Sequence, residues 1–251
     1  MAVDVRDAIR QLTAGVLVEE KQVKFATRVA LTRTAKKVEA AEQHEMRDIF
    51  DRPTPFTMSG LFVRPATATK LSAEVKLKDF AGKSSTPAAT YMAAQIKGGM
   101  RGQKRFERAL QAIGALPPGY RVVPGDGAEL DAYGNMSRGQ IVQILSFFNA
   151  FPEAGYKANM SDKRRQSLAR GSKTRQGMAY FVGRPGDRLP LGIYQRVHFA
   201  GGTSIRPVMI FVRSVTYQAT FDFKYVAEKA IEQHFASEFQ RALAEARATQ
   251  R

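Results

Sequence analysis

The chain has 251 residues, of which 44% are hydrophobic and 10% aromatic, enough for one large folded domain or two small ones. It contains no Cys and only three scattered His, which excludes disulfides and thiolate metal sites and argues against a histidine metal centre. The net charge of +16 is uneven, because residues 1–55 sum to +1 and residues 222–251 to zero. A basic middle is typical of a protein that meets a polyanion such as nucleic acid, although solubility alone is an alternative explanation.

The first fifty residues predict two helices. Val5, Ile9 and Leu12 recur at helical spacing and predict a short amphipathic helix. From about residue 19 to residue 50, small side chains recur every three or four positions on one face, which predicts a long helix that can approach a neighbour closely. The prolines of residues 51–55 cannot continue this helix and end it.

The middle of the chain mixes short elements. Residues 60–68 and 71–80 predict two strands, and residues 82–87 a loop. A helix is predicted over 104–112, a short strand near 120–125, and a second helix after Ser137 as N-cap. Residues 161–176 are rich in Gly, Ser, Lys and Arg and show no apolar periodicity, so they predict an exposed loop.

The closing part predicts strands and a final helix. Residues 177–199 indicate two strands around a turn at 184–190, and residues 205–215 a central strand that is apolar on both faces. Residues 222–250 form an amphipathic helical pattern. We therefore expect an α+β fold, with long N-terminal and C-terminal helices packed on a mainly antiparallel sheet. Residues 1–81 and 177–251 would form the core, and residues 82–176 a partly helical, basic insertion.

No acid–base or nucleophilic constellation stands out in the sequence. Asp126, Glu129 and Asp131 crowd one segment, but they lack the ligand order of a calcium loop and favour a solvated acidic turn over a cation site. The glycine-rich residues 98–102 lack the Lys-Ser/Thr of a phosphate-binding loop. We therefore expect no enzyme activity, catalytic residue, metal or cofactor. No apolar run is long enough to cross a bilayer, so we expect no membrane partner.

The basic residues favour loose contact with a polyanion. No exposed aromatic is interleaved with them in the sequence, so stacking on single-stranded nucleic acid is not indicated. Neither cluster lies on a recognisable DNA-recognition helix, so sequence-specific readout is not indicated either. Salt-sensitive contact with a phosphate backbone fits better, and an acidic protein partner remains an alternative. The residues expected to face DNA or an acidic partner are Arg101, Lys104, Arg105, Lys163, Arg164, Arg165, Arg170, Lys173 and Arg175.

Both ends of the chain resemble a known family. The early segment "AIRQLTAGVLVEEKQVKFATRVALTRTAKKVEAA" contains Ala26, Ala30 and Ala35 around Leu31, Thr32 and Arg33. Together with the strands "GIYQRVHF" and "IRPVMIFVRSV" and the closing "EQHFASEFQRALAEA", it resembles the minor tail protein Z family of long-tailed phages. More distantly, the plan resembles tail-completion and neck proteins that join phage heads to tails. Residues 82–176 have no counterpart in this pattern.

The resemblance implies a structural protein of the virion, assembled in the bacterial cytoplasm and located at the head–tail junction. It implies a homo-oligomeric ring, six- or twelve-fold, around the path of the genomic DNA, which it would contact nonspecifically between portal or connector and tail proteins. Residues on the terminal helices would serve subunit packing; they are Val23, Ala26, Ala30, Val38, Ile231, Phe235, Phe239 and Leu243. The alternative is a free, sequence-nonspecific DNA-binding protein that acts as a packaging or regulatory factor.

Overall fold

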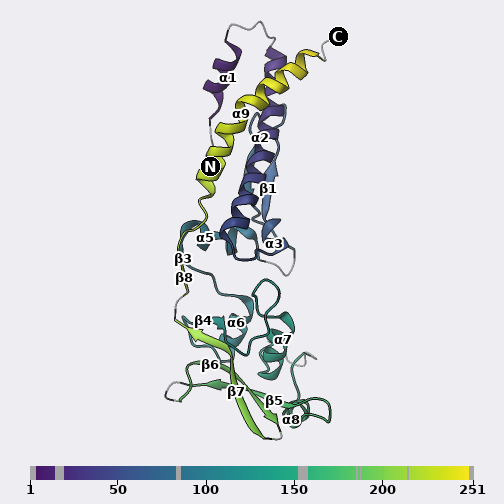
Figure 1. The fold of residues 1–251 in the computed structure, drawn as a ribbon, viewed down its shortest axis with the longest axis vertical. Coiled ribbons are helices and arrows are strands. Elements are labelled where there is room, and N and C mark those ends of the chain that lie inside the picture. The colour runs from purple at the N-terminus through teal and green to yellow at the C-terminus, as the bar shows by residue number, and fades with distance from the viewer. Residues whose placement is uncertain are drawn as a thin grey trace. The chain divides into compact units, whose positions relative to one another are not determined.

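A computed structural model describes residues 4–14, 20–82, 86–151, 158–184, 186, 188–199, 201–213 and 215–248. The chain divides into two compact units, unit 1 with residues 1–99 and 217–251, and unit 2 with residues 100–216 (Figure 1). The predicted boundaries at 82 and 176 are therefore wrong. The three closing strands belong to unit 2, because they pair with a strand of the predicted insertion rather than with the strands of unit 1.

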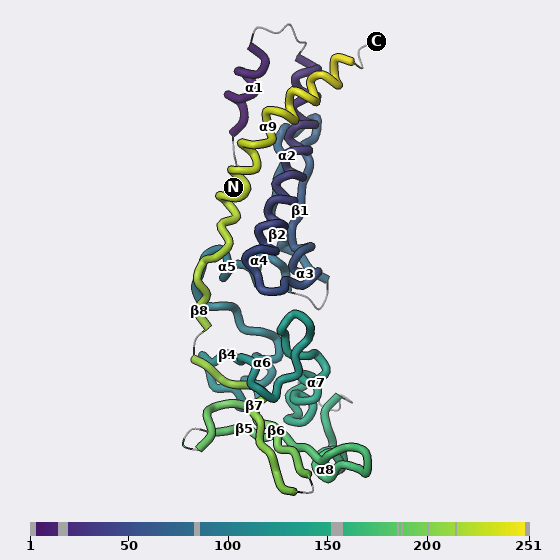
Figure 2. The backbone as a smooth tube through the Cα atoms, viewed as in Figure 1, coloured from purple at the N-terminus to yellow at the C-terminus, as the bar shows by residue number. Residues whose placement is uncertain are grey.

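Unit 1 is built on a pair of long helices. Helix α2 (Glu20–Ile49) runs beside α9 (Phe223–Ala248), and the short α1 (Arg6–Thr13) packs against α9 (Figures 1 and 2). Small side chains allow this approach, since Ala26 and Ala30 are fully buried against aromatic side chains of α9. The three helices that the terminal periodicities predicted are thus confirmed.

The residues expected to serve subunit packing all lie within this helix pair of a single chain. Six of the eight are buried there, and Val23 and Ile231 are half-buried at the edge of the same clusters. Their apolar surface is largely buried inside unit 1, so contacts between chains would have to be made by other side chains.

A two-stranded antiparallel sheet covers part of α2. Strand β1 (Leu61–Arg64) pairs with β2 (Glu74–Leu77), and Val75 packs against a cluster that α2 and α9 share. Three short helices complete unit 1; they are α3 (Pro55–Met58), α4 (Ala88–Tyr91) and α5 (Ala93–Lys97). The predicted loop at 82–87 and the predicted turn at 184–190 fall partly outside the described residues.

Unit 2 is built on a four-stranded antiparallel sheet in the order β4-β7-β6-β5. Its strands are β4 (Arg121–Pro124), β5 (Gly177–Gly183), β6 (Gly192–Phe199) and β7 (Gly202–Val212). As predicted, the strand that is apolar on both faces is central, since β7 lies between β4 and β6 with Val208 and Met209 fully buried. Two helices, α6 (Arg105–Ala112) and α7 (Arg138–Phe147), contribute Leu110 and Ile144 to the same core.

The fold class is confirmed as α+β with antiparallel sheets. The terminal helices do pack on an antiparallel sheet, but that sheet is β1–β2, and the larger sheet belongs to the inserted unit. The chain passes from one unit to the other twice, once in β3 (Gly99–Met100) and once in β8 (Thr216–Tyr217). These two short strands pair with each other as a third sheet. None of the helices in the described part of the chain combines the length and apolar composition needed to span a bilayer.

Candidate polyanion-binding surface

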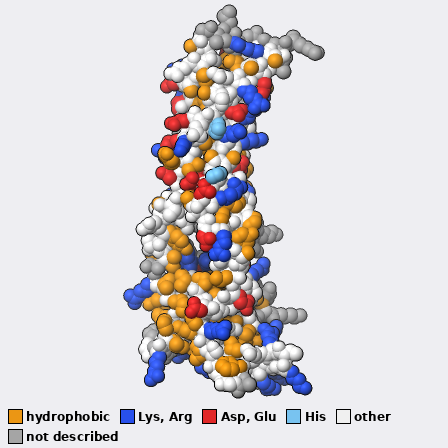
Figure 3. All heavy atoms as spheres, in the orientation of Figure 1, with side chains coloured by type: hydrophobic (Ala, Val, Ile, Leu, Met, Phe, Trp, Pro, Cys, Tyr) orange, Lys and Arg blue, Asp and Glu red, His pale blue; other side chains and the backbone are white. Residues whose placement is uncertain are grey.

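The excess positive charge is concentrated in unit 2. Its sequence holds eighteen Lys and Arg against seven Asp and Glu, a net of +11, whereas unit 1 holds twenty-one against sixteen, a net of +5. In the space-filling view, acidic and basic side chains alternate over the helices of unit 1, while acidic side chains are fewer on the visible face of unit 2 (Figure 3). A polyanion would therefore be attracted chiefly to unit 2.

The basic run at 161–176 begins with a helix, and the prediction of a loop is wrong for its first half. Helix α8 (Asp162–Arg170) is capped by Ser161, whose hydroxyl accepts a hydrogen bond from the Arg164 N–H at 3.4 Å. Asp162 lies in the first turn, where a negative charge stabilises the helix dipole. The helix ends at Gly171, which takes a positive φ of 75° that favours glycine. The helix is therefore defined by its capping residues, because it has no apolar stripe.

The cations of α8 have two different roles. Lys163, Arg164 and Arg170 are exposed and make no ion pair within the described part of the chain. Arg165 is only 30% exposed; it pairs with Asp162 and donates a hydrogen bond to the Phe147 carbonyl at 3.0 Å. Arg165 therefore ties α8 to the end of α7, and its assignment to DNA contact is corrected to a structural one.

A tight turn after α8 presents two more cations. The backbone of Ser172 and Arg175 closes the turn with reciprocal N–H···O=C bonds of 2.8 and 3.3 Å. Lys173 and Arg175 are exposed on it. Gly177 follows, and a Cβ there would lie 2.1 Å from the Ala169 carbonyl oxygen, so only glycine lets β5 approach the end of α8 this closely. The turn is thereby fixed against the sheet.

These cations border an open hollow of about 520 Å³. Arg170, Lys173 and Arg175 line it, and its remaining side chains carry no carboxylate; they are Ser172, Thr174, Gln176, His198 and Phe199. His198 comes from β6, because its Cα pairs with Gly177 in the β5–β6 register, and its Nδ1 lies 3.1 Å from the Thr203 Oγ1.

His198 and Phe199 are site residues that the sequence analysis missed. They lie more than twenty residues after the basic run, and only the strand register brings them to it. The resulting hollow, called here the α8–β6 hollow, can receive an anion with both charge and hydrogen bonds, since arginine, lysine and hydroxyl groups are the usual protein ligands of phosphate.

The cluster around α6 does not join this hollow. Arg101 is only 12% exposed in its side chain and pairs with the fully buried Glu107 at 2.5 and 3.0 Å, while also donating to the Val122 carbonyl at 2.9 Å. Its predicted DNA-facing role is corrected, because its charge is used inside unit 2. Lys104 and Arg105 are exposed at the start of α6, but neither lines the α8–β6 hollow.

The acidic turn of unit 2 is held by its own hydrogen bonds. Asp131 accepts from the backbone N–H groups of Tyr133 and Asn135, both at 2.9 Å, and Glu129 accepts from the Ser137 hydroxyl at 3.3 Å. Among the residues that the structure describes, no group of acidic and histidine side chains is arranged to hold a metal ion. The turn therefore has a structural role in positioning α7.

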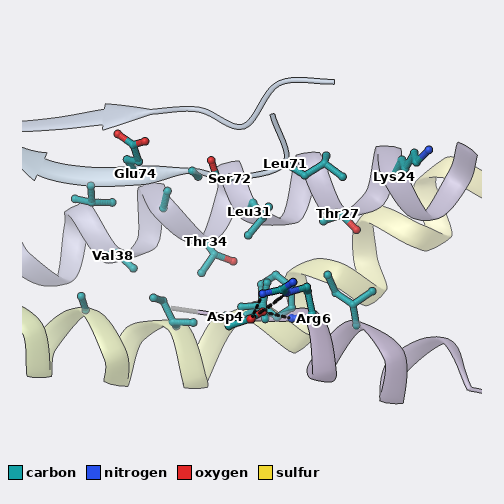
Figure 4. Close-up of a pocket in the computed structure, with 18 of the residues that line it drawn as sticks. Asp4, Arg6, Lys24, Thr27, Leu31, Thr34, Val38, Leu71, Ser72 and Glu74 are labelled. Carbon is teal, nitrogen blue, oxygen red and sulfur yellow. Dashed lines mark hydrogen bonds and ion pairs between the residues drawn. The ribbon is translucent and has the colours of Figure 1, made fainter. Parts of the chain in front are cut away.

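A second hollow, of about 620 Å³, lies in unit 1 between α1, α2, α9 and residues 71–75. Its lining is mainly apolar, and Thr34 points from α2 into the space between the helices, near the paired Asp4 and Arg6 (Figure 4). The Thr34 hydroxyl has no hydrogen-bond partner there, and neither has the buried Ser72 hydroxyl. This hollow contains none of the residues expected to face DNA.

Comparison with known proteins gives no match. Neither a protein-family model, nor a curated protein, nor a solved structure resembles the chain closely enough to match it.

Proposed function

We propose that this chain is a structural protein of a phage head–tail junction, which assembles as a ring around the DNA path between connector and tail proteins. The proposal rests on the family resemblance of the chain's ends together with one structural observation. Exposed cations gather on α8 and the turn after it without ion-pair partners among the described residues; they are Lys163, Arg164, Arg170, Lys173 and Arg175.

This arrangement suits loose contact with DNA. Unpaired surface cations attract phosphates over a distance of about 10 Å at 0.1 M salt, and the attraction weakens as salt rises. In a ring, the modest field of each copy would be repeated by symmetry, so the DNA would be guided without being held tightly by any single subunit. Unit 1, whose net charge of +5 is lower than the +11 of unit 2, would contact the neighbouring proteins.

A pair of charge reversals tests the DNA contact. We expect Lys163→Glu/Arg164→Glu to weaken retention of duplex DNA and to reduce the slope of log K against log salt concentration by about 2. The matched control is Lys36→Glu/Lys37→Glu, which reverses two adjacent exposed lysines on α2 of unit 1 and is expected to leave retention nearly unchanged. Equal effects of the two variants would show that net charge, not this surface, governs DNA contact.

The place in the particle needs a separate measurement. A junction protein should sediment with phage particles and appear by imaging as a ring on the DNA axis, while the isolated chain stays largely monomeric until it meets its neighbours. The second candidate function is a free DNA-binding protein, which the α8–β6 hollow also favours. Such a protein would be absent from purified particles and would bind duplex DNA alone, with strong salt dependence.

A further inference from the structure

The α8–β6 hollow contains an aromatic side chain that the fold does not use. Phe199 ends β6 with 48% of its surface exposed, and it belongs to none of the apolar clusters of the described chain. Its ring edge lies beside Gly201 and Gly202 of the β6–β7 connection, which carry no side chains of their own. An aromatic ring in such a position is available to a ligand.

We propose that the hollow binds single-stranded DNA, with an unpaired base stacked on Phe199 and the adjoining phosphates held by Lys173 and Arg175. The inference deepens the proposed function, on whose DNA contact it rests. Duplex DNA needs only cations, because its bases are stacked on one another and reachable only from the grooves. An exposed ring among cations is instead the combination that single-strand binding proteins use.

The other groups of the hollow fit a nucleotide. Its volume of about 520 Å³ is larger than a phosphate needs and lies within the range of about 300 to 1,000 Å³ of pockets for small organic ligands. Hydroxyls of Ser172 and Thr174 lie on the same turn as Lys173 and can donate to phosphate oxygens. The His198 Nδ1 is engaged by Thr203, so the Nε2 remains for a polar atom of the base or sugar.

The charge of the hollow favours an anionic ligand. Three cations line it and no carboxylate does, so a cationic or metal ligand would be repelled. Its cations come from one helix end and one turn, and its ring from a strand end, so the positions of base and phosphate are set by three neighbouring pieces of backbone. A bare phosphate would leave Phe199 without a function.

Fluorescence anisotropy of the full chain tests the inference, with labelled oligo(dT) of about fifteen nucleotides and a duplex of the same length as probes. We expect Phe199→Leu, which keeps the apolar bulk but removes the aromatic face, to weaken binding of oligo(dT) about 5- to 100-fold and to leave duplex binding unchanged. Lys173→Gln should weaken both. The matched control is Phe80→Leu, which changes an exposed aromatic of unit 1 and should alter neither.

The outcomes separate this inference from the proposed function. If the unmodified chain binds the duplex but not oligo(dT), or if Phe199→Leu leaves oligo(dT) binding intact, the single-strand site is refuted and the junction protein stands. Binding of oligo(dT) that depends on Phe199, without duplex binding, would support the site and count against the DNA-channel role. Unchanged far-UV circular dichroism of Phe199→Leu excludes misfolding as the cause of a loss.

Discussion

Among the described residues, unit 1 and unit 2 each bury one glutamate completely, and they hold it in opposite ways. Glu107 in unit 2 receives hydrogen bonds from Arg101 and from the backbone N–H groups of Val122 and Lys104. Burial alone would raise the pKa of Glu107, but these bonds outweigh it and lower the pKa. Glu42 on α2 has no hydrogen-bond partner for either oxygen, and burial, with the nearby Glu45 and Asp222, raises its pKa to about 8. Glu42 is therefore protonated at neutral pH.

The same contrast extends to other polar atoms. Every buried side-chain oxygen that lacks a hydrogen-bond partner in the described chain belongs to unit 1, including those of Thr34, Glu42 and Ser72. An unpaired buried polar group costs about 1 to 3 kcal/mol, so unit 1 loses stability that unit 2 retains. The net charge counted from the sequence also differs from the charge at the surface. Arg101 is paired with a buried glutamate, and Glu42 is buried and neutral.

The largest effect is expected from breaking the satisfied pair in unit 2. Glu107→Gln would leave the nearly buried Arg101 without its counter-charge, so the free energy of unfolding should fall by about 3 to 5 kcal/mol. Urea denaturation of the full chain measures this. The control is Glu74→Gln, which removes a half-buried partner of Arg64 and Lys70 and should cost at most about 1 kcal/mol. Similar losses in both variants would contradict the stabilising role assigned to Glu107.

A smaller effect, with a pH signature, is expected at Glu42. Between the ordinary glutamate pKa and about 8, the unfolded chain has lost the Glu42 proton and the folded chain keeps it, so stability falls as pH rises. The slope is about 1.4 kcal/mol per pH unit, and Glu42→Gln removes it. The variant should therefore gain about 2 to 3 kcal/mol over the unmodified chain on going from pH 5 to pH 7.

Denaturation at the two pH values, with Glu232→Gln on the exposed face of α9 as control, measures the Glu42 effect. The control should show no such gain. If the stability difference between Glu42→Gln and the unmodified chain were independent of pH, the carboxyl would have to be ionised or paired in the folded state.

Much of the fold could be predicted from the sequence because periodicity is a local property. The small-residue stripe of α2, the amphipathic pattern of α9 and the two-sided apolarity of β7 each identify their element. The division into units could not be predicted in this way. It depends on the pairing of β4 with β7, in which Val123 lies opposite Ile210, and nothing in either segment alone specifies that partner.

Of the candidate site, only the positively charged residues could be predicted from the sequence. Lys173 and Arg175 were recognised as exposed cations, but α8 was missed because its evidence is in capping by Ser161 and Gly171 rather than in an apolar stripe. Phe199 joins the site through strand register, which is a long-range property. The internal role of Arg101 was missed because it depends on which acid is buried beside it, and burial is decided by tertiary packing.

The smallest expected effect concerns two threonines of α2 that lie two residues apart. The Thr34 hydroxyl is buried without a partner, so Thr34→Val keeps the shape, removes a desolvated polar group and should stabilise the chain by about 1 kcal/mol. The Thr32 hydroxyl donates to the Arg28 carbonyl at 2.9 Å and accepts from the Ala66 N–H at 3.2 Å. Thr32→Val should therefore destabilise by about 1 kcal/mol. Because Val replaces Thr on the same helix in both variants, helix propensity cancels, and urea denaturation compares the two hydroxyls alone. Destabilisation by Thr34→Val as well would mean that the Thr34 hydroxyl has a partner in solution, such as a water molecule in the hollow of unit 1.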